Sequence, residues 1–167
     1  MTIYFDGVGF EAEHLCVKQF NGQLLTDREH QYNDIDCYVS TKDGKKFTAS
    51  VKDQRTSMKQ GYTTIQLELE QINTRTRKRQ DGCFIKNKSD YYFWLVWYEN
   101  KAQWLIIKSS KLKAFVKENK DSLRTWCTKE ATEQKNRSYG RTYDRSKGVM
   151  ISVSQLIELG QLKELAQ

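Results

Sequence analysis

The amino-acid sequence predicts one α/β domain spanning residues 1–167, in which helices flank a mixed central β-sheet. Three observations predict this fold. Apolar residues recur at near-helical spacing over residues 8–20. Apolar and polar residues alternate over 35–40 and again over 47–52, as they do in half-buried strands. The run YYFWLVWY at 91–98 is aromatic and β-branched, which is typical of a buried central strand.

The first helix is expected to end near Asn21-Gly22, a pair with the composition of a helix C-terminal stop. Residues 23–34 are polar and turn-like, and the two alternating strands follow them. The loop Lys42-Asp43-Gly44 joins these strands into a hairpin, with the glycine in the left-handed conformation.

The length of this loop sets the register of the hairpin. A three-residue loop puts every apolar residue on one face, through the pairs Val39–Phe47, Cys37–Ala49 and Ile35–Val51. The other face then carries Asp36 opposite Ser50 and Asp34 opposite Lys52. A two-residue loop would instead set Asp36 opposite Val51 and mix charged with apolar residues, which a half-buried sheet resists. We therefore expect the three-residue register.

The remaining elements are expected in this order. Residues 63–72 form a strand rather than a short helix, and the basic run at 75–79 with Gln80-Asp81-Gly82 forms an exposed connection. Another strand covers 101–109, and a helix covers 111–119 with Leu112, Phe115 and Val116 inward. The polar, basic segment 128–148 is a long loop or flap, and 149–153 is a short strand.

The chain is expected to close with a helix from about Gln155, with Ser152 and Gln155 as a capping box. Its apolar side would consist of Leu156, Ile157, Leu159, Leu162 and Leu165.

Composition narrows the class of protein. The formal net charge is +7, yet residues 1–36 hold seven acidic residues against only Lys18 and Arg28. An acidic pocket in a basic body suits a protein that attracts a polyanion and holds a divalent cation. No apolar run is long enough to span a membrane, and no signal peptide is recognisable, so we expect a cytoplasmic protein. The four cysteines, Cys16, Cys37, Cys83 and Cys127, lack the spacing of zinc ligands and are expected to be reduced thiols in the core.

The polar face of the hairpin carries residue types that suit phosphodiester hydrolysis. That reaction needs a hard cation to neutralise the phosphate and activate water, and a further cation near the same oxygens. Asp34 and Asp36 project to the same side, with Ser50 and Lys52 beside them, and Glu13 could approach from the first helix. By spacing alone, a solvated strand face with one cross-strand ion pair is an equal alternative.

The order of these elements resembles the PD-(D/E)xK nuclease superfamily, which includes restriction enzymes, junction resolvases and phage endonucleases. The resemblance covers roughly residues 8–120. It implies a restriction-endonuclease-like αβββαβ core, with Glu13 as the helix-borne glutamate and Asp36, or Asp34, as the aspartate at a strand start. Ser50-Val51-Lys52 matches the acid-x-lysine motif, with Ser50 where the family usually has an acid. Glu68 or Glu70 could supply a migrated carboxylate.

The resemblance implies a DNA endonuclease that uses Mg²⁺ or Mn²⁺ and acts as a homodimer. The enzyme would either be directed to junctions or branches in DNA, or be a compact phage or homing endonuclease. Asp36, Glu13 and Asp34, with the carbonyl of residue 51, would hold the metal. Lys52 would orient the attacking water, and Gln54 could touch the phosphate. The residues expected to contact DNA are Arg55, Lys59, Arg75, Arg77, Lys78, Arg79, Lys135, Arg137, Tyr139, Arg141, Tyr143, Arg145 and Lys147.

Two other classes stay open. A non-catalytic DNA-binding protein would use the same basic residues and is favoured if Ser50 removes the metal site. A protein-interaction or inhibitor domain with a vestigial site is the weaker alternative.

Overall fold

The computed structural model describes residues 7–73, 76–128 and 145–167. Its helices are α1 (Gly7–Gln19), α2 (Arg28–Tyr32), α3 (Arg55–Lys59), α4 (Cys83–Lys86), α5 (Ser109–Asn119) and α7 (Val153–Leu159). Its strands are β1 (Gln23–Leu24), β2 (Cys37–Ser40), β3 (Lys46–Asp53), β4 (Thr64–Ile72), β5 (Arg79–Asp81), β6 (Tyr91–Tyr98), β7 (Lys101–Lys108), β8 (Arg124–Cys127), β9 (Arg145–Ser152) and β10 (Gln161–Glu164). None of the helices described is long and apolar enough to cross a membrane.

The larger sheet has six strands in the order β1-β2-β3-β6-β7-β10. The β3–β6 pair is parallel, and all the other neighbouring pairs are antiparallel. Two antiparallel hairpins, β2–β3 and β6–β7, therefore lie side by side and meet at the parallel pair. Strand β6 is buried from Tyr92 to Val96, as predicted for a central strand. The predicted α/β class with a mixed sheet flanked by helices is confirmed.

The β2–β3 hairpin has the predicted register. Cys37 pairs with Ala49 and Val39 with Phe47. The loop closes through a hydrogen bond of 2.9 Å from the Thr41 N–H to the Lys45 carbonyl. Gly44 has φ +83° and takes the left-handed position that such loops need.

The expected Ile35–Val51 strand pair does not form. The ladder between β2 and β3 ends at Cys37, and the chain turns at Asp34, where φ is +54°. In place of a partner in β2, the Val51 N–H donates to the Asp36 carboxylate at 2.7 Å. The turn thus brings the side chains of Asp34 and Asp36 to the end of the hairpin, beside β3.

The large sheet separates two hydrophobic cores. One face packs against α1, where the fully buried Ala12 and Cys16 contact apolar residues of β2, β3 and β6. The other face packs against α5, α7 and the second sheet. Because side chains alternate along a strand, Ser50 and Lys52 share this second face with Tyr92 and Trp94, their partners in β6.

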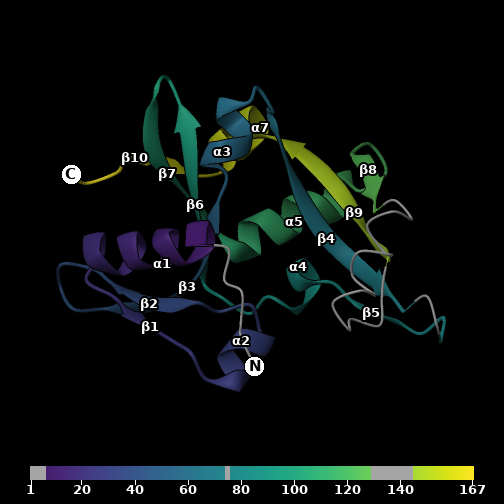
Figure 1. Ribbon diagram of the computed structural model, residues 1–167, viewed down its shortest axis with the longest axis horizontal. Coiled ribbons are helices and arrows are strands. Elements are labelled where there is room, and N and C mark those ends of the chain that lie inside the picture. Colours follow the sequence, from purple (N-terminus) through teal and green to yellow (C-terminus); the bar gives the residue numbers. More distant parts are fainter. Residues whose placement is uncertain (1–6, 74–75, 129–144) are drawn as a thin grey trace.

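A second sheet has four strands in the order β5-β4-β9-β8, which lie together on the right of Figure 1. The predicted strand at 63–72 is confirmed as β4, which pairs with β9 and bulges between Glu68 and Glu70. Strand β9 starts earlier than the predicted 149–153, and Gly148 within it lies close to β4. A Cβ atom at Gly148 would stand 1.8 Å from the Leu67 carbonyl oxygen. Only glycine permits this approach of the two strands.

The prediction of a helix to the end of the chain is wrong beyond Leu159. Helix α7 begins with the predicted capping box between Ser152 and Gln155. Gly160 then adopts an extended conformation, and a Cβ there would lie 2.5 Å from the Ile106 carbonyl oxygen. The following residues form β10, an edge strand on β7, so Leu162 and Leu165 are not on the helix.

Several short elements were not predicted from the sequence: β1, β5, β8 and the helices α2, α3 and α4. The predicted exposed basic connection is confirmed for Arg77 to Asp81, although its last part pairs with β4 as β5. Most of the predicted flap, residues 129–144, lies outside the described residues. Its last part, from Arg145, already belongs to β9.

The prediction that the cysteines lie in the core is confirmed for Cys16 and Cys37, which are buried. It is wrong for Cys83 and Cys127, which are exposed at the start of α4 and the end of β8.

Candidate active site

The ion pair between Lys52 and Asp34 is the centre of the candidate site. The Lys52 ammonium lies 2.6 Å from Asp34 Oδ1, and the two side chains are 32% and 13% exposed. Asp34 reaches Lys52 because it occupies the left-handed turn before β2, a conformation that aspartate adopts more readily than most residues. The predicted juxtaposition of Asp34 with Lys52 is present.

Asp34 has little capacity left for a metal ion. Its Oδ2 accepts hydrogen bonds of 3.1 Å from the hydroxyl of Ser50 and from the side-chain amide of Asn87. Asn87 also donates to the Asp34 backbone carbonyl at 3.1 Å, and both Ser50 and Asn87 are fully buried. Ser50 therefore does not replace the missing acid; it holds Asp34, which in turn holds Lys52.

Asn87 is a residue that the sequence reasoning missed. It lies just after α4, and its Oδ1 accepts from the backbone N–H and the hydroxyl of Ser89 at 3.1 and 3.0 Å. No periodic pattern identifies such a residue, because its partners come from distant parts of the chain.

Asp36 lies beside this network at the end of the hairpin. Its Oδ2 accepts from the Val51 N–H. Burial raises the pKa of the Asp36 carboxyl, and the positive charge of Lys52 only partly offsets this effect. Because burial disfavours the ionised form of this carboxyl group, a cation bound beside it would stabilise that form.

Glu13 approaches the same point from α1. This helix packs on the opposite face of the sheet from Lys52, but the charges of both Asp36 and Lys52 act on the Glu13 carboxyl. Burial, with the nearby charge of Asp36, raises the pKa of Glu13 to about 7. Glu13 and Asp36 thus disfavour each other's ionised form.

Lys52 remains charged in this setting. Burial by itself would lower the pKa of Lys52, but the negative charges of Asp34 and Asp36 outweigh burial and raise it. The ammonium is a permanent positive charge at the end of β3.

The donor set for a divalent cation is small. Within the ranges that the structure describes, no group of three or more Asp, Glu, His or Cys side chains is arranged to hold a metal ion. The carboxylates of Asp36 and Glu13 remain, and the Val51 carbonyl points to the same side of β3 as its N–H. Two carboxylates and a carbonyl suit Mg²⁺, which usually keeps several of its water ligands.

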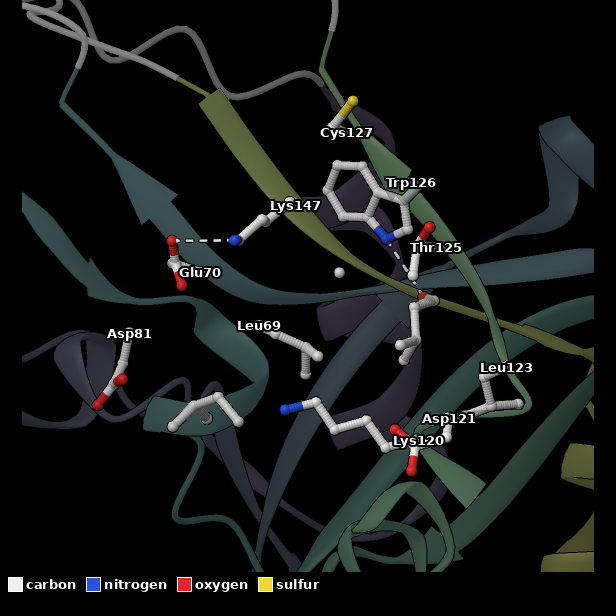
Figure 2. Close-up of a pocket in the computed structure, with 13 residues that line it drawn as sticks. Leu69, Glu70, Asp81, Lys120, Asp121, Leu123, Thr125, Trp126, Cys127 and Lys147 are labelled. Carbon is white, nitrogen blue, oxygen red and sulfur yellow. Dashed lines mark hydrogen bonds and ion pairs between the residues drawn. The ribbon is translucent and has the colours of Figure 1, made fainter. Parts of the chain in front are cut away.

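Of the two glutamates considered as migrated carboxylates, only Glu68 reaches the cavity beside Lys52. Its Oε1 accepts from the Cys83 N–H at the start of α4, at 3.0 Å. Glu70 instead forms ion pairs of 3.4 Å with Arg79 and with Lys147. It lines a separate groove of about 890 Å³ on the second sheet (Figure 2).

Residues that follow β3 differ in their freedom to contact DNA. Gln54 also lines the cavity beside Lys52, and its Oε1 accepts from the Ser57 hydroxyl at 3.1 Å. Arg55 is held by the carboxylates of Asp53 and Glu11, at 2.8 and 3.3 Å. The ammonium of the exposed Lys59 lies 4.3 Å from the centre of the Trp97 ring.

Basic residues gather at one end of the second sheet. Arg79 and Arg145 pair with Ile72 from opposite sides, and the exposed Arg77 and Lys78 form the adjoining turn. Ile72 is four residues along β4 from Glu68, which is about 13 Å at roughly 3.3 Å per residue. Six of the predicted DNA contacts lie outside the described residues: Arg75, Lys135, Arg137, Tyr139, Arg141 and Tyr143.

No protein-family model, curated protein or solved structure matches this chain. Its function is therefore inferred from the residues of the site.

Proposed function

We propose that this protein is a metal-dependent endonuclease that hydrolyses phosphodiester bonds in DNA. The observation that carries the proposal is the convergence of Asp36, Glu13 and Lys52 at the end of the β2–β3 hairpin. Glu13 comes from α1, Asp36 from the segment just before β2, and Lys52 from β3. Together they leave two carboxyl groups with raised pKa beside a permanent cation.

The topology supports the same proposal. Helix α1 precedes the antiparallel strands β1, β2 and β3, with α2 between β1 and β2. The crossover to β6, which is parallel to β3, contains α3 and α4 together with β4 and β5 of the second sheet. Apart from α2 and these two inserted strands, the order resembles the restriction-endonuclease-like αβββαβ core. In this comparison Glu13 would be the helix-borne glutamate, Asp36 the aspartate at a strand start, and Ser50-Val51-Lys52 the tripeptide of the next strand.

Asp36 and Glu13, with the Val51 carbonyl, would hold the cation. When bound, Mg²⁺ or Mn²⁺ would neutralise phosphate charge and lower the pKa of a water molecule. Asp36 and Glu13 would then both be ionised, and their mutual repulsion would be relieved.

Lys52 would contact a non-bridging phosphate oxygen and stabilise the charge that develops there. Asp34 is a positioning residue, because it fixes the Lys52 ammonium without reaching the phosphate. Ser50 and Asn87 fix Asp34 in turn. Gln54 lies next to Lys52 and can donate to the phosphate or to the attacking water.

The basic end of the second sheet would bind the DNA backbone. The turn at Arg77–Arg79 and the start of β9 would contact phosphates further along the same DNA, because Ile72, which pairs with both, lies about 13 Å along β4 from Glu68 at the cavity.

The proposal is tested by incubating the protein with supercoiled plasmid and a synthetic four-way junction in Mg²⁺, Mn²⁺ or EDTA. The variants are Asp36→Asn, Glu13→Gln and Lys52→Met, with Asp43→Asn in the exposed hairpin loop as a matched control. We expect cutting in either metal, none in EDTA, and losses of about 100-fold or more in the first three variants only. Metal-independent cutting, or cutting that survives in all three variants, would refute the proposal.

A second candidate is a DNA-binding protein that does not cut. The observation that favours it is the use of Asp34 by three donors, which leaves only two carboxylates for a metal. DNA binding that weakens steeply with salt, without cleavage in any metal, would select this alternative.

A further inference from the structure

A cavity of about 260 Å³ opens directly beside the candidate active site. Asp34, Lys52 and Gln54 form one of its walls. A group bound in this cavity would thus lie next to the phosphate that Lys52 is proposed to contact.

The rest of the cavity is largely aromatic. Phe84, Tyr92, Trp94 and Trp126 all line it, and they come from α4, β6 and β8. The Tyr92 and Trp94 rings are stacked, with centroids 4.6 Å apart and planes inclined by 12°. Tyr92 is also stacked on Phe84, with centroids 6.2 Å apart and planes inclined by 22°, so two aromatic rings hold it rigidly. Rigid, largely apolar walls suit a flat aromatic ligand.

One polar atom in this cavity has no partner. Tyr92 is only 2% exposed, and its hydroxyl forms no hydrogen bond with any described residue. A buried hydroxyl without a partner is costly, and most buried polar atoms in folded proteins are paired. A ligand with a donor or acceptor on its edge would satisfy it.

Two side-chain amides add hydrogen-bonding capacity. Gln54 and Gln66 both line the cavity, and Gln66 is exposed. An amide offers both a donor and an acceptor, the combination that base edges pair with.

We propose that this cavity receives one nucleobase of the substrate, turned out of its stack, beside the phosphate that is cut. The inference rests on the proposed nuclease function and names its substrate: a single strand, or a site where a base is unpaired. A base inside a duplex could not reach walls that are as buried as Tyr92 and Trp94.

The test is an abasic scan in EDTA, where no metal-dependent cutting occurs. Each position of a short single-stranded oligonucleotide is replaced in turn by a tetrahydrofuran abasic residue, and its affinity for the full chain is measured. We expect one position at which loss of the base weakens binding about five- to tenfold. In Mg²⁺ that position should adjoin the cleaved bond.

The Tyr92→Phe variant tests whether the cavity is the place where the base binds. This variant should bind the intact oligonucleotide less tightly, and the abasic penalty should shrink at the sensitive position only. Gln66→Ala should act in the same direction. Tyr98→Phe and Gln60→Ala, on residues outside the cavity, should leave the scan unchanged. Tyr92→Phe should not lower the melting temperature, because the hydroxyl it removes has no partner.

A flat scan, or an abasic penalty that is the same in Tyr92→Phe as in the native protein, would overturn the inference. If the protein cuts DNA but no abasic position weakens binding, the base site alone is refuted. If one abasic position weakens binding but no cutting occurs, the nuclease function is refuted and the base site stands. Absence of DNA binding refutes both.

Discussion

Replacing Glu13 with glutamine should remove a pH dependence of stability that the native protein shows in EDTA. The pKa of Glu13 is raised from 4.5 to about 7 in the folded protein, mainly by burial and by Asp36. Between these two values the unfolded chain releases a proton that the folded protein keeps. The free energy of unfolding therefore falls as the pH rises from about 4.5 to 7.

The size of the effect follows from the shift. Each pKa unit corresponds to about 1.4 kcal/mol, so the shift from 4.5 to about 7 sets an upper limit of about 3.5 kcal/mol. Glu13 retains some contact with water, and we expect about 2 kcal/mol. Glutamine cannot ionise, so Glu13→Gln should lose most of this slope.

Urea unfolding followed by tryptophan fluorescence at pH 5 and pH 8 measures the slope. Glu158→Gln, on an exposed glutamate of α7, is the control and should keep the native slope. Mg²⁺ should stabilise the native protein more at pH 8 than at pH 5, because binding requires ionised carboxylates. The reasoning is refuted if Glu13→Gln has the same pH dependence as the native protein.

Three further predictions concern the support of the site and the fold. Asp34→Asn should destabilise the protein by about 2 kcal/mol, because it leaves the half-buried Lys52 without its main partner; adding Lys52→Met should recover part of this loss in urea unfolding. Ser152→Ala should cost about 1 kcal/mol by removing the capping box of α7, whereas Ser154→Ala should cost less. Cys83 and Cys127 are exposed while Cys16 and Cys37 are buried, so a thiol reagent should modify two cysteines in the native protein and four in denaturant; rapid modification of all four would contradict the fold.

The hairpin could be predicted because its register depends only on local information. Alternation along β2 and β3, together with Gly44, selects one pairing, and the structure has that pairing. Asp34 does lie beside Lys52, but it gets there through the left-handed turn that precedes β2. At Ile35 the chain leaves the ladder, although alternation predicts that the pairing continues. Only the structure shows that Asp36 binds the Val51 N–H.

Other features depend on partners far away in the chain. Leu162 continues the spacing of α7, but pairing of the next residues with β7 and the close approach of Gly160 to Ile106 override that pattern. Asn87 joins the site through its hydrogen bond to Asp34, and Tyr92 through its pairing with Ser50 of β3. Short elements such as α3 and α4 carry too few residues to show a period.

The parallel β3–β6 pair also has a consequence for the order of folding. Each of the hairpins β2–β3 and β6–β7 closes over a short loop, so both can form early. The parallel pair forms only after the long crossover between the two hairpins has closed. Contacts between residues far apart in the sequence form slowly, because the loop between them must close first. Lys52 belongs to one hairpin and Tyr92 to the other. A nascent chain that has both hairpins but not their docking would therefore have no cavity beside Lys52, and refolding measured by DNA binding should lag behind refolding measured by strand content.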